Sequence, residues 1–347
     1  RLRCDWSSDV CSSDLNAAAA EIEERPKSTM ITGGRQQRLL ITDAPPTSPS
    51  SDAGLSFSTT MRVPVADGYM GLAAGPALLP HGNCARMQLA VAQAPVELGD
   101  IDANLATSRK LLKQAQSACD GGLDLLVLPE LFLTGYLLRD DYAHVAEAVP
   151  GDGPAQAGLA ALAAESGVHI AAGLVERGRE SLYNVALLVG PDGYIGHYRK
   201  RYLPNFGPFE EKLHFGAGNA TPVFETPLGR IGMQVCYDIF FPTQSLALAH
   251  AGAELILNIS ASPTTSRPLF HRMLPARAIE TTCFWAFANN VGVQGSLTFG
   301  GESCIVDPRG RFVGEAPALE PGVAVAEIDL GALPSFREAR PVLRDSQ

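Results

Sequence analysis

The sequence lacks the patterns that would indicate a metal site, a disulfide framework or a membrane anchor. Its seven cysteines form no C-x-x-C pair, which argues against structural zinc and thioredoxin-like redox chemistry. No stretch approaches the roughly 18–20 consecutive apolar residues that span a bilayer. Lys and Arg number 27 against 37 Asp and Glu, a net charge of −10. Because phosphate backbones attract positive charge, we expect no nucleic-acid partner. Because a membrane-spanning stretch is missing, we expect no membrane partner.

Nucleotide-binding glycine motifs are also missing. No G-x-G-x-x-G follows an apolar run, and no G-x-x-x-x-G-K-[ST] occurs, so neither a dinucleotide nor a nucleoside triphosphate site is indicated. The odd cysteine count in a chain of 347 residues favours reduced thiols. We therefore predict a cytoplasmic protein.

The first 86 residues differ from the rest. Residues 5–15, DWSSDVCSSDL, resemble the conceptual translation of a short-read sequencing adapter, as found at the ends of assembled metagenomic contigs, so residues 1–15 are expected to be an assembly artefact. The alternative is a genuine polar arm. Residues 16–86 lack periodicity and are rich in Ala, Pro and Ser, which predicts a disordered extension. Periodic segments begin at Met87, a plausible true start, and predict a single domain over 87–347.

Within that domain, apolar runs alternate with amphipathic segments. The runs predict strands over 89–93, 123–128, 169–174, 182–189, 194–199, 231–235, 255–259, 284–288, 303–306, 311–313 and 323–328. The amphipathic segments predict a first helix that is capped by Asp100 or Asp102 and runs to about 118. They also predict helices over 154–166, 242–251 and 267–282, the last with a kink at Pro275. Turn residues at 191–193 and 307–310 predict two hairpins. This alternation favours a layered α/β domain with a mixed sheet.

Three chemically reactive residues each follow a predicted strand. Cys236 ends the run 231–235, at the position where α/β folds place chemistry. Glu130 follows the run 123–128 among apolar neighbours, and such desolvation raises a carboxyl pKa and suits it to proton transfer. Lys200 ends the run 194–199. Taken alone, each residue has an ordinary explanation. Cys236 could be a small buried apolar residue, Glu130 a solvated loop residue, and Lys200 part of a basic surface run.

The combination is more specific. Glu, Lys and Cys occur in that order, within the stretches LPELFLTGY, YRKRYLP with EEKLHF, and GMQVCYDIFFP. RAIETTCFWAFANNVG and GGESCIVDPRG are further stretches of the same kind. Together they resemble the carbon–nitrogen hydrolase (nitrilase) superfamily over residues 87–347. The resemblance implies a four-layer αββα sandwich with two mixed sheets, no metal and no organic cofactor. It also implies a homodimer or higher oligomer.

The resemblance further implies a role for each residue. Glu130 matches the general base, Cys236 the nucleophile, and Lys200 the group that stabilises the tetrahedral intermediate. Glu211 matches a second carboxylate that orients the lysine and the substrate, although Glu210 competes for that place.

The chemistry supports these roles independently. A free thiol has a pKa near ~8.5, so it needs help to react at neutral pH. Glu130 can take its proton, and the Lys200 ammonium favours the resulting anion. Lys200 and the backbone N–H of Tyr237 are natural donors to the oxyanion. The expected path runs through a thioester on Cys236, which water then hydrolyses.

The residues after the cysteine bear on the substrate. True nitrilases commonly have Trp-Glu there, whereas Tyr237-Asp238 stands here, which favours an amide or N-carbamoyl substrate over a nitrile. Many relatives have His in place of Tyr202 and Glu in place of Thr243, which puts substrate preference in doubt. The residues expected to line a substrate pocket are Tyr136, Phe206, Phe209, Phe240, Ser262 and Pro263.

Other interpretations remain open. The same triad could hydrolyse a nitrile or transfer the acyl group to an amine. A Cys–His hydrolase would use His197, His214 or His271, although no C-G-x-C-W context surrounds Cys236. An inactive relative could act as an interaction module. For the oligomer, we expect part of the interface on the helix after Cys236 and on the C-terminal segment.

Overall fold

The computed structural model describes residues 86–119 and 122–346. The predicted N-terminal extension lies outside the described residues except for Arg86, which begins the first strand. In the described part of the chain, no helix combines the length and the apolar character needed to cross a bilayer.

The first sheet has six strands and is mixed. Strands β1, β2 and β3 run parallel, while β14 pairs antiparallel with β1, and β3, β4 and β5 form an antiparallel meander. In sheet order the strands are β14 (Gly322–Asp329), β1 (Arg86–Gln93), β2 (Leu125–Val127), β3 (His169–Arg177), β4 (Leu182–Gly190) and β5 (Gly193–Arg199). The predicted hairpin at 191–193 joins β4 to β5.

The second sheet also has six strands and is mixed. Strands β7, β8 and β9 are parallel, flanked by antiparallel β6 on one side and by β12 and β13 on the other. The strands in order are β13 (Phe312–Glu315), β12 (Cys304–Val306), β9 (Phe284–Asn289), β8 (Leu255–Ser260), β7 (Gly229–Val235) and β6 (Val223–Thr226). A separate hairpin pairs β10 (Val291–Gln294) with β11 (Leu297–Gly300).

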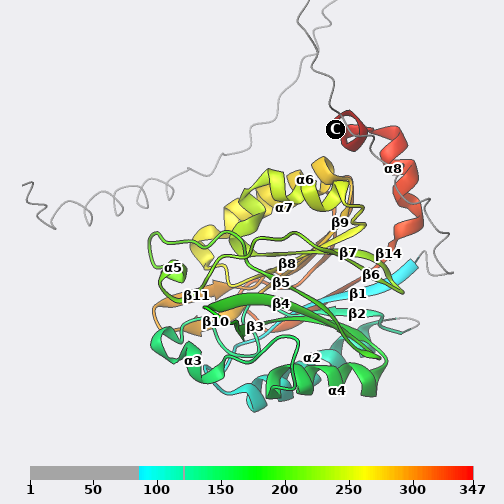
Figure 1. Ribbon diagram of the computed structural model, residues 1–347. Helices are drawn as coiled ribbons and strands as arrows, with labels where there is room; N and C mark the ends of the chain where they lie inside the picture. Colours follow the sequence, from blue (N-terminus) through cyan, green and yellow to red (C-terminus); the bar gives the residue numbers. More distant parts are fainter. Residues whose placement is uncertain (1–85, 120–121, 347) are drawn as a thin grey trace, which may run out of the picture. The chain divides into compact units, whose positions relative to one another are not determined.

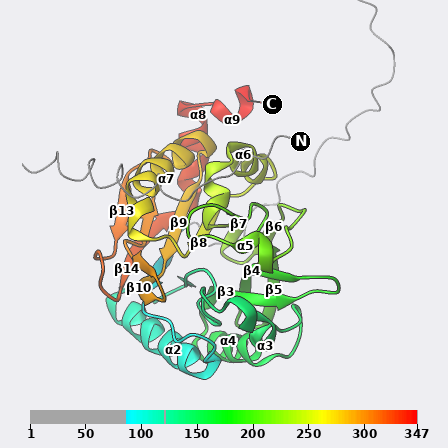
Figure 2. The ribbon, with the colours of Figure 1, turned by 90° about the vertical axis from the view of Figure 1, so that its left-hand side faces the viewer.

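Helices cover the outer face of each sheet, and the sheets face one another (Figure 1). Helices α2 (Ile101–Ala118) and α4 (Pro154–Ser166) cover the first sheet, and α6 (Pro242–His250) and α7 (Arg267–Thr281) cover the second, as Figure 2 shows from the side. The predicted αββα sandwich with two mixed sheets is therefore confirmed. The shorter helices are α3 (Tyr142–Val145), α5 (Glu211–His214), α8 (Leu333–Ala339) and α9 (Val342–Asp345).

Strand alternation builds the core. In β1, Leu89 and Val91 pack in the cluster between the sheets, while Ala90 and Ala92 pack in the cluster under α2 and α4. Successive side chains of a strand point to opposite faces, so an apolar run with both faces covered reads as continuously hydrophobic. This is why β1 is apolar at every one of these positions.

Local signals fix the main helix ends. Asp100 accepts a hydrogen bond from Ala103 N–H at 2.9 Å and caps α2, and Gly167 ends α4 in the left-handed conformation. Helix α7 continues through Pro275 and ends at Thr281. Sequence patterning missed β6, the β10–β11 hairpin, α3, α5 and the C-terminal helices, because elements of four to seven residues show too little periodicity.

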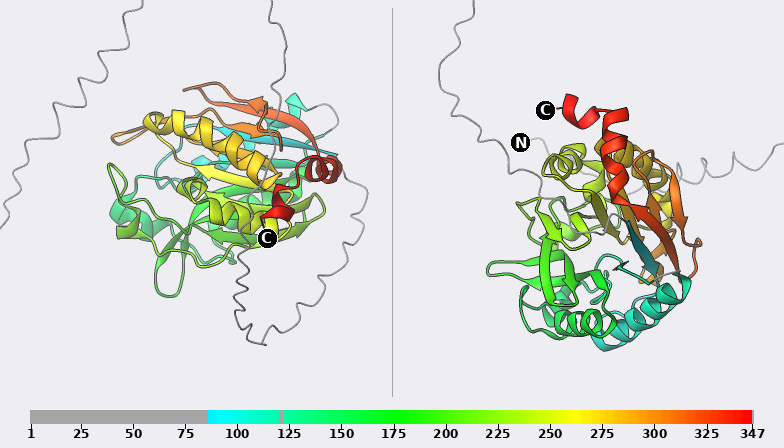
Figure 3. Two further views of the ribbon diagram at one scale, coloured as in Figure 1. Left: turned by 90° about the horizontal axis from the view of Figure 1, so that it is seen from above. Right: turned by 90° about the vertical axis from the view of Figure 1, so that its right-hand side faces the viewer.

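The C-terminal segment lies beside α6. Helix α9 contacts α6 and α7, and the Ser346 hydroxyl lies 3.2 Å from His250 Nε2 (Figure 3, red). The two regions expected to share an oligomer interface are thus neighbours in the fold of this chain.

Candidate active site

Glu130 sits in a turn that is fastened to the neighbouring strand. After β2 the chain continues to pair with β3, since Gly173 N–H donates to Pro129 O at 3.0 Å and Leu133 N–H donates to Gly173 O at 3.0 Å. Leu131 has φ of +47°, an uncommon backbone conformation for a branched residue. A Cβ at residue 173 would lie 2.1 Å from Leu131 N, so only glycine admits this turn.

Lys200 joins two carboxylates in a fully buried ion cluster. It follows β5, and its Nζ lies 2.7 Å from Glu130 Oε1 and 2.7 Å from Glu211 Oε1. Burial by itself would lower the pKa of Lys200, but the two carboxylates outweigh it and hold the pKa above its ordinary value. The lysine is therefore a permanent cation inside the protein.

Further donors hold Glu130 in place. Asn184 Nδ2 donates to Oε1 at 2.7 Å, and Ala261 N–H donates to Oε2 at 2.6 Å. Asn290 Nδ2 donates to the Glu130 carbonyl at 3.0 Å. The donors come from β4, from the residue after β8 and from the residue after β9. The carboxylate is thereby held between both sheets.

Cys236 is the first residue of a short 3₁₀ helix, η2 (Cys236–Phe240), at the end of β7. Its φ is +47° and the residue is 7% exposed. Burial raises the pKa of its thiol well above the ordinary value, and Glu130 adds to the rise, whereas Lys200 and the N–H of Ala261 act in the opposite direction. The resting thiol is thus protonated at neutral pH and needs a base to become nucleophilic.

Glu211, not Glu210, faces the lysine. It begins α5 and is 3% exposed, and its Oε1 also accepts the Tyr136 hydroxyl at 2.6 Å. Burial raises the pKa of Glu211 to about 7, against the opposing effect of Lys200. Among the described residues, its Oε2 has no hydrogen-bond partner. That oxygen is available to a substrate N–H.

The N–H of Tyr237 belongs to the first turn of η2. The first N–H groups of a helix have no acceptor within it, so the Tyr237 N–H has no partner inside η2. The side chain of Tyr237 also borders a cavity of about 620 Å³, together with Phe206 and residues of the 201–217 segment. This volume is in the range of small-molecule sites.

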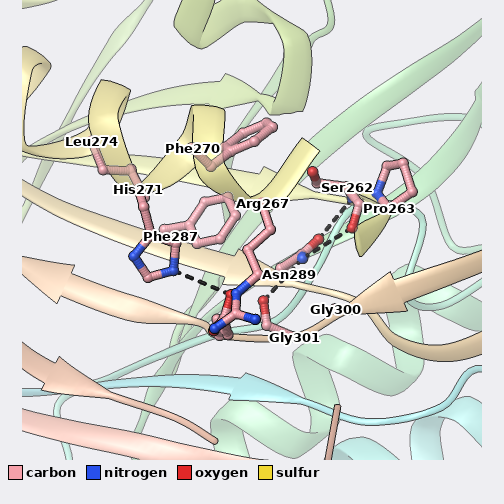
Figure 4. Close-up of a pocket in the computed structure, with 11 residues that line it drawn as sticks. Ser262, Pro263, Arg267, Phe270, His271, Leu274, Phe287, Asn289, Gly300 and Gly301 are labelled. Atoms are coloured by element: carbon pink, nitrogen blue, oxygen red, sulfur yellow. Dashed lines mark hydrogen bonds and ion pairs between the residues drawn. The ribbon is translucent and has the colours of Figure 1, made fainter. Parts of the chain in front are cut away.

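The other residues expected at the pocket are spread out. Tyr136 borders a cavity of about 30 Å³ beside Glu211. Ser262 and Pro263 line a third cavity of only about 10 Å³ under α7, shown in Figure 4, large enough for a single water molecule. The described residues that line these three cavities do not include Phe209 or Phe240.

The rings of Phe209 and Phe240 pack against other aromatic rings instead. Phe240 packs edge-on against Phe270 with ring centroids 5.4 Å apart, and Phe209 packs against Phe206 at 5.5 Å. The two departures from the family pattern lie nearby. Tyr202 stacks on Phe241 with centroids 3.5 Å apart, and Thr243 is exposed at the start of α6.

The three candidate histidines have partners of their own. His197 Nδ1 lies 2.7 Å from the Tyr194 hydroxyl, and His271 Nε2 lies 3.1 Å from Glu302 Oε2. His214 packs against the Tyr142 ring at 5.3 Å. Besides burial, the groups that affect the Cys236 pKa most are Glu130, Lys200, Glu211 and the Ala261 N–H. These electrostatic interactions favour Glu and Lys over His as partners of the thiol.

Sequence reasoning missed three groups around Glu130. Ala261 follows the predicted strand 255–259, so its place at the end of a parallel strand was a usable signal. Asn184 lies within β4 and Asn290 precedes β10, and neither has a local pattern that marks it. Among the described residues, no group of three or more His, Cys, Asp or Glu could hold a metal ion.

Known proteins are similar to this chain in sequence and in fold. The family model for carbon–nitrogen hydrolases matches residues 88–338. A nitrilase from Pyrococcus abyssi is 36% identical over 248 residues, covering 70% of this chain and 90% of the relative. The 2-oxoglutaramate amidase of Bacillus subtilis is 37% identical over 225 residues, covering 64% and 84%. A solved variant of the amidase from Nesterenkonia sp. AN1, with acrylamide added to its active-site cysteine, is 31% identical with a TM-score of 0.62, covering 75% and 99%.

Proposed function

The chain belongs to the carbon–nitrogen hydrolase family and is an amidase-type enzyme that hydrolyses C–N bonds, and from this premise we propose that it cleaves a small carboxamide or N-carbamoyl compound through a thioester on Cys236. The observation that carries the proposal is the buried cluster in which Lys200 lies 2.7 Å from both Glu130 and Glu211. All three charged groups shift the pKa of the Cys236 thiol.

Acylation starts from the neutral thiol. Glu130 takes the thiol proton as the sulfur attacks the carbonyl carbon, and the carbonyl π electrons move onto oxygen. The Lys200 ammonium and the Tyr237 N–H stabilise that oxyanion. When the C=O bond reforms, the C–N bond breaks, and Glu130 returns its proton to the leaving nitrogen. Ammonia or an amine departs, and a thioester remains on Cys236.

Deacylation repeats these proton transfers with water. Glu130 takes a proton from water as the oxygen attacks the thioester carbon. Collapse of the second tetrahedral intermediate breaks the C–S bond, and the thiolate regains the proton from Glu130. The sum is amide plus water giving carboxylic acid plus ammonia, with the enzyme unchanged.

Glu211 orients the reactants in this scheme. Its Oε1 accepts both the Lys200 ammonium and the Tyr136 hydroxyl, which fixes the lysine toward Glu130. Its unpartnered Oε2 accepts an N–H of the substrate amide. A nitrile has no N–H to offer, which supports an amide as the substrate.

The experiment is ammonia release by the full chain from ω-amides, N-carbamoyl compounds, simple aliphatic amides and nitriles. We expect release from one amide or N-carbamoyl class, abolished by Cys236→Ala. Cys304→Ala is the matched control, because Cys304 is also a buried cysteine and lies on β12. Release from nitriles alone would support the nitrilase alternative that the Pyrococcus relative represents.

Two further outcomes separate the remaining alternatives. Product formation only when an amine is added would indicate acyl transfer. No turnover from a folded protein whose Cys236 resists alkylation would contradict the triad and favour an interaction module.

A further inference from the structure

Asp238 is a buried carboxylate on which three donors converge. Its Oδ2 accepts the Val235 N–H at 2.9 Å and the Tyr198 hydroxyl at 2.8 Å, and its Oδ1 accepts the Tyr202 N–H at 2.9 Å. The residue is fully buried. Both oxygens therefore accept hydrogen bonds. Each donor residue lies one or two positions in the sequence from Cys236 or Lys200.

The donors come from two segments that carry the proposed chemistry. Val235 directly precedes Cys236, while Tyr198 and Tyr202 lie two residues before and two residues after Lys200. One carboxylate thus fastens the turn that bears the thiol to the strand end that bears the ammonium.

The turn at Cys236 needs such a fastening. A non-glycine residue with φ of +47° is held in a sparsely populated backbone region, which persists only where surrounding contacts fix it. Asp238 is the third residue of η2, and its bond to the Val235 N–H ties the residue before Cys236 to the first turn of that helix.

The direction of the Tyr198 bond is determined by its other partners. Gln244 Nε2 and the Arg201 N–H both donate to the Tyr198 oxygen, at 2.5 Å and 3.1 Å. A phenol has one proton to donate, so that proton goes to Asp238. The tyrosine therefore acts as a rigid link from β5 to the carboxylate.

We propose that Asp238 is a positioning residue of this enzyme, whose carboxylate fixes the Cys236 sulfur relative to the Lys200 ammonium. The proposal rests on the hydrolysis assigned above for its effect on turnover. It makes a separate statement about thiol reactivity, which holds whatever the substrate.

A carboxylate is required because all three partners are donors. In Asp238→Asn, the amide NH₂ would face either the Tyr202 N–H or the pair formed by Val235 and Tyr198, leaving a buried donor unpaired. One of the two segments must then shift. Misplacement of reacting groups by about 1 Å costs up to ~10²-fold in rate.

The test compares Asp238→Asn and Asp238→Glu in the full chain. For Asp238→Asn we expect kcat to fall by roughly 10- to 100-fold with KM within about threefold, since alignment rather than binding is lost. We also expect alkylation of Cys236 by acrylamide at pH 7 to slow by about tenfold or more. Asp238→Glu keeps the carboxylate and should recover most of both losses.

The matched control is Asp307→Asn. Asp307 is also buried and accepts the N–H groups of Arg309 and Arg311, but it lies in the β12–β13 turn. It should lower the melting temperature and leave kcat and alkylation unchanged. Equal losses in Asp307→Asn and Asp238→Asn, or an Asp238→Asn variant within twofold of wild type in both rates, would overturn the proposal.

Tyr198→Phe keeps the test decisive if Asp238→Asn does not fold. It removes one donor and retains the ring, so kcat and alkylation should fall in the same direction, and wild-type values would overturn the proposal. If wild type turns over no amide, the proposed hydrolysis fails, while the alkylation rates still decide the role of Asp238.

Discussion

At the scale of single residues, the proposed mechanism gives Lys200 two tasks. It pairs with two buried carboxylates, and it donates to the developing oxyanion. Buried charges tolerate the loss of a partner poorly, because removing one member leaves the others unpaired in a low-dielectric setting. The lysine therefore contributes to stability and to catalysis through the same nitrogen.

Lys200→Met should lower both kcat and the unfolding free energy, unlike an ordinary surface substitution. We expect kcat to fall by on the order of 10²–10³-fold, as for the loss of one oxyanion donor. We also expect a loss of about 3–5 kcal/mol in unfolding free energy, as for a broken buried ion pair. Steady-state kinetics and urea unfolding measure the two. Lys110→Met on the exposed face of α2 is the control, and a similar loss there would contradict the assignment.

The raised pKa of Glu211 predicts a pH dependence with a definite sign. The folded carboxyl has a pKa of about 7, above its ordinary value of 4.5, so between those values the folded state binds a proton that the unfolded state has released. Stability from this group therefore falls as pH rises from about 4.5 to 7. Melting temperatures measured across that range should decline less in Glu211→Gln than in wild type. Parallel curves would contradict the prediction.

At the scale of elements, the carboxyl ends of β2, β5 and β7 bring the reactive residues together. Strand alternation and apolar runs predicted these strands from the sequence, and so the residues that follow them were identifiable. Asn184 and Asp238 were not assigned a place in the catalytic machinery. Asn184 contacts Glu130, and Asp238 contacts Tyr198 and Tyr202, and these contacts join segments distant in the chain. Local periodicity carries no record of such pairings.

The turn after β2 gives a prediction of its own. In Gly173→Ala, the new Cβ would meet backbone atoms of Glu130 and Leu131 at 2.1–2.7 Å, so the turn must move. Overpacking of this kind costs about 1–3 kcal/mol, and the displaced Glu130 should reduce kcat. In Gly300→Ala the new Cβ would lie an ordinary 3.7 Å from its nearest neighbour, Thr264 Cγ2, so stability and kcat should stay near wild type. Thermal melts and kinetics of both variants make the comparison.

At the scale of the whole molecule, assembly and the cytoplasmic location stay predictions. We propose a homodimer or larger oligomer with α6 and the C-terminal segment at an interface. Light scattering of the full chain should give at least twice the monomer mass. Ala247→Arg places a charged side chain on the exposed face of α6 and should lower that mass, whereas Leu319→Arg, also exposed, should not. A monomeric wild type would contradict the proposal.

The central claim is that the acyl group of the substrate passes through the sulfur of Cys236. The most direct measurement is the intact mass of the full chain, acid-quenched during turnover of an amide that it hydrolyses, followed by peptide mapping. We predict an added mass equal to the acyl group, located on Cys236 and removed by hydroxylamine. Ammonia release with no acyl adduct in the pre-steady state, or with the adduct on another residue, would contradict the account.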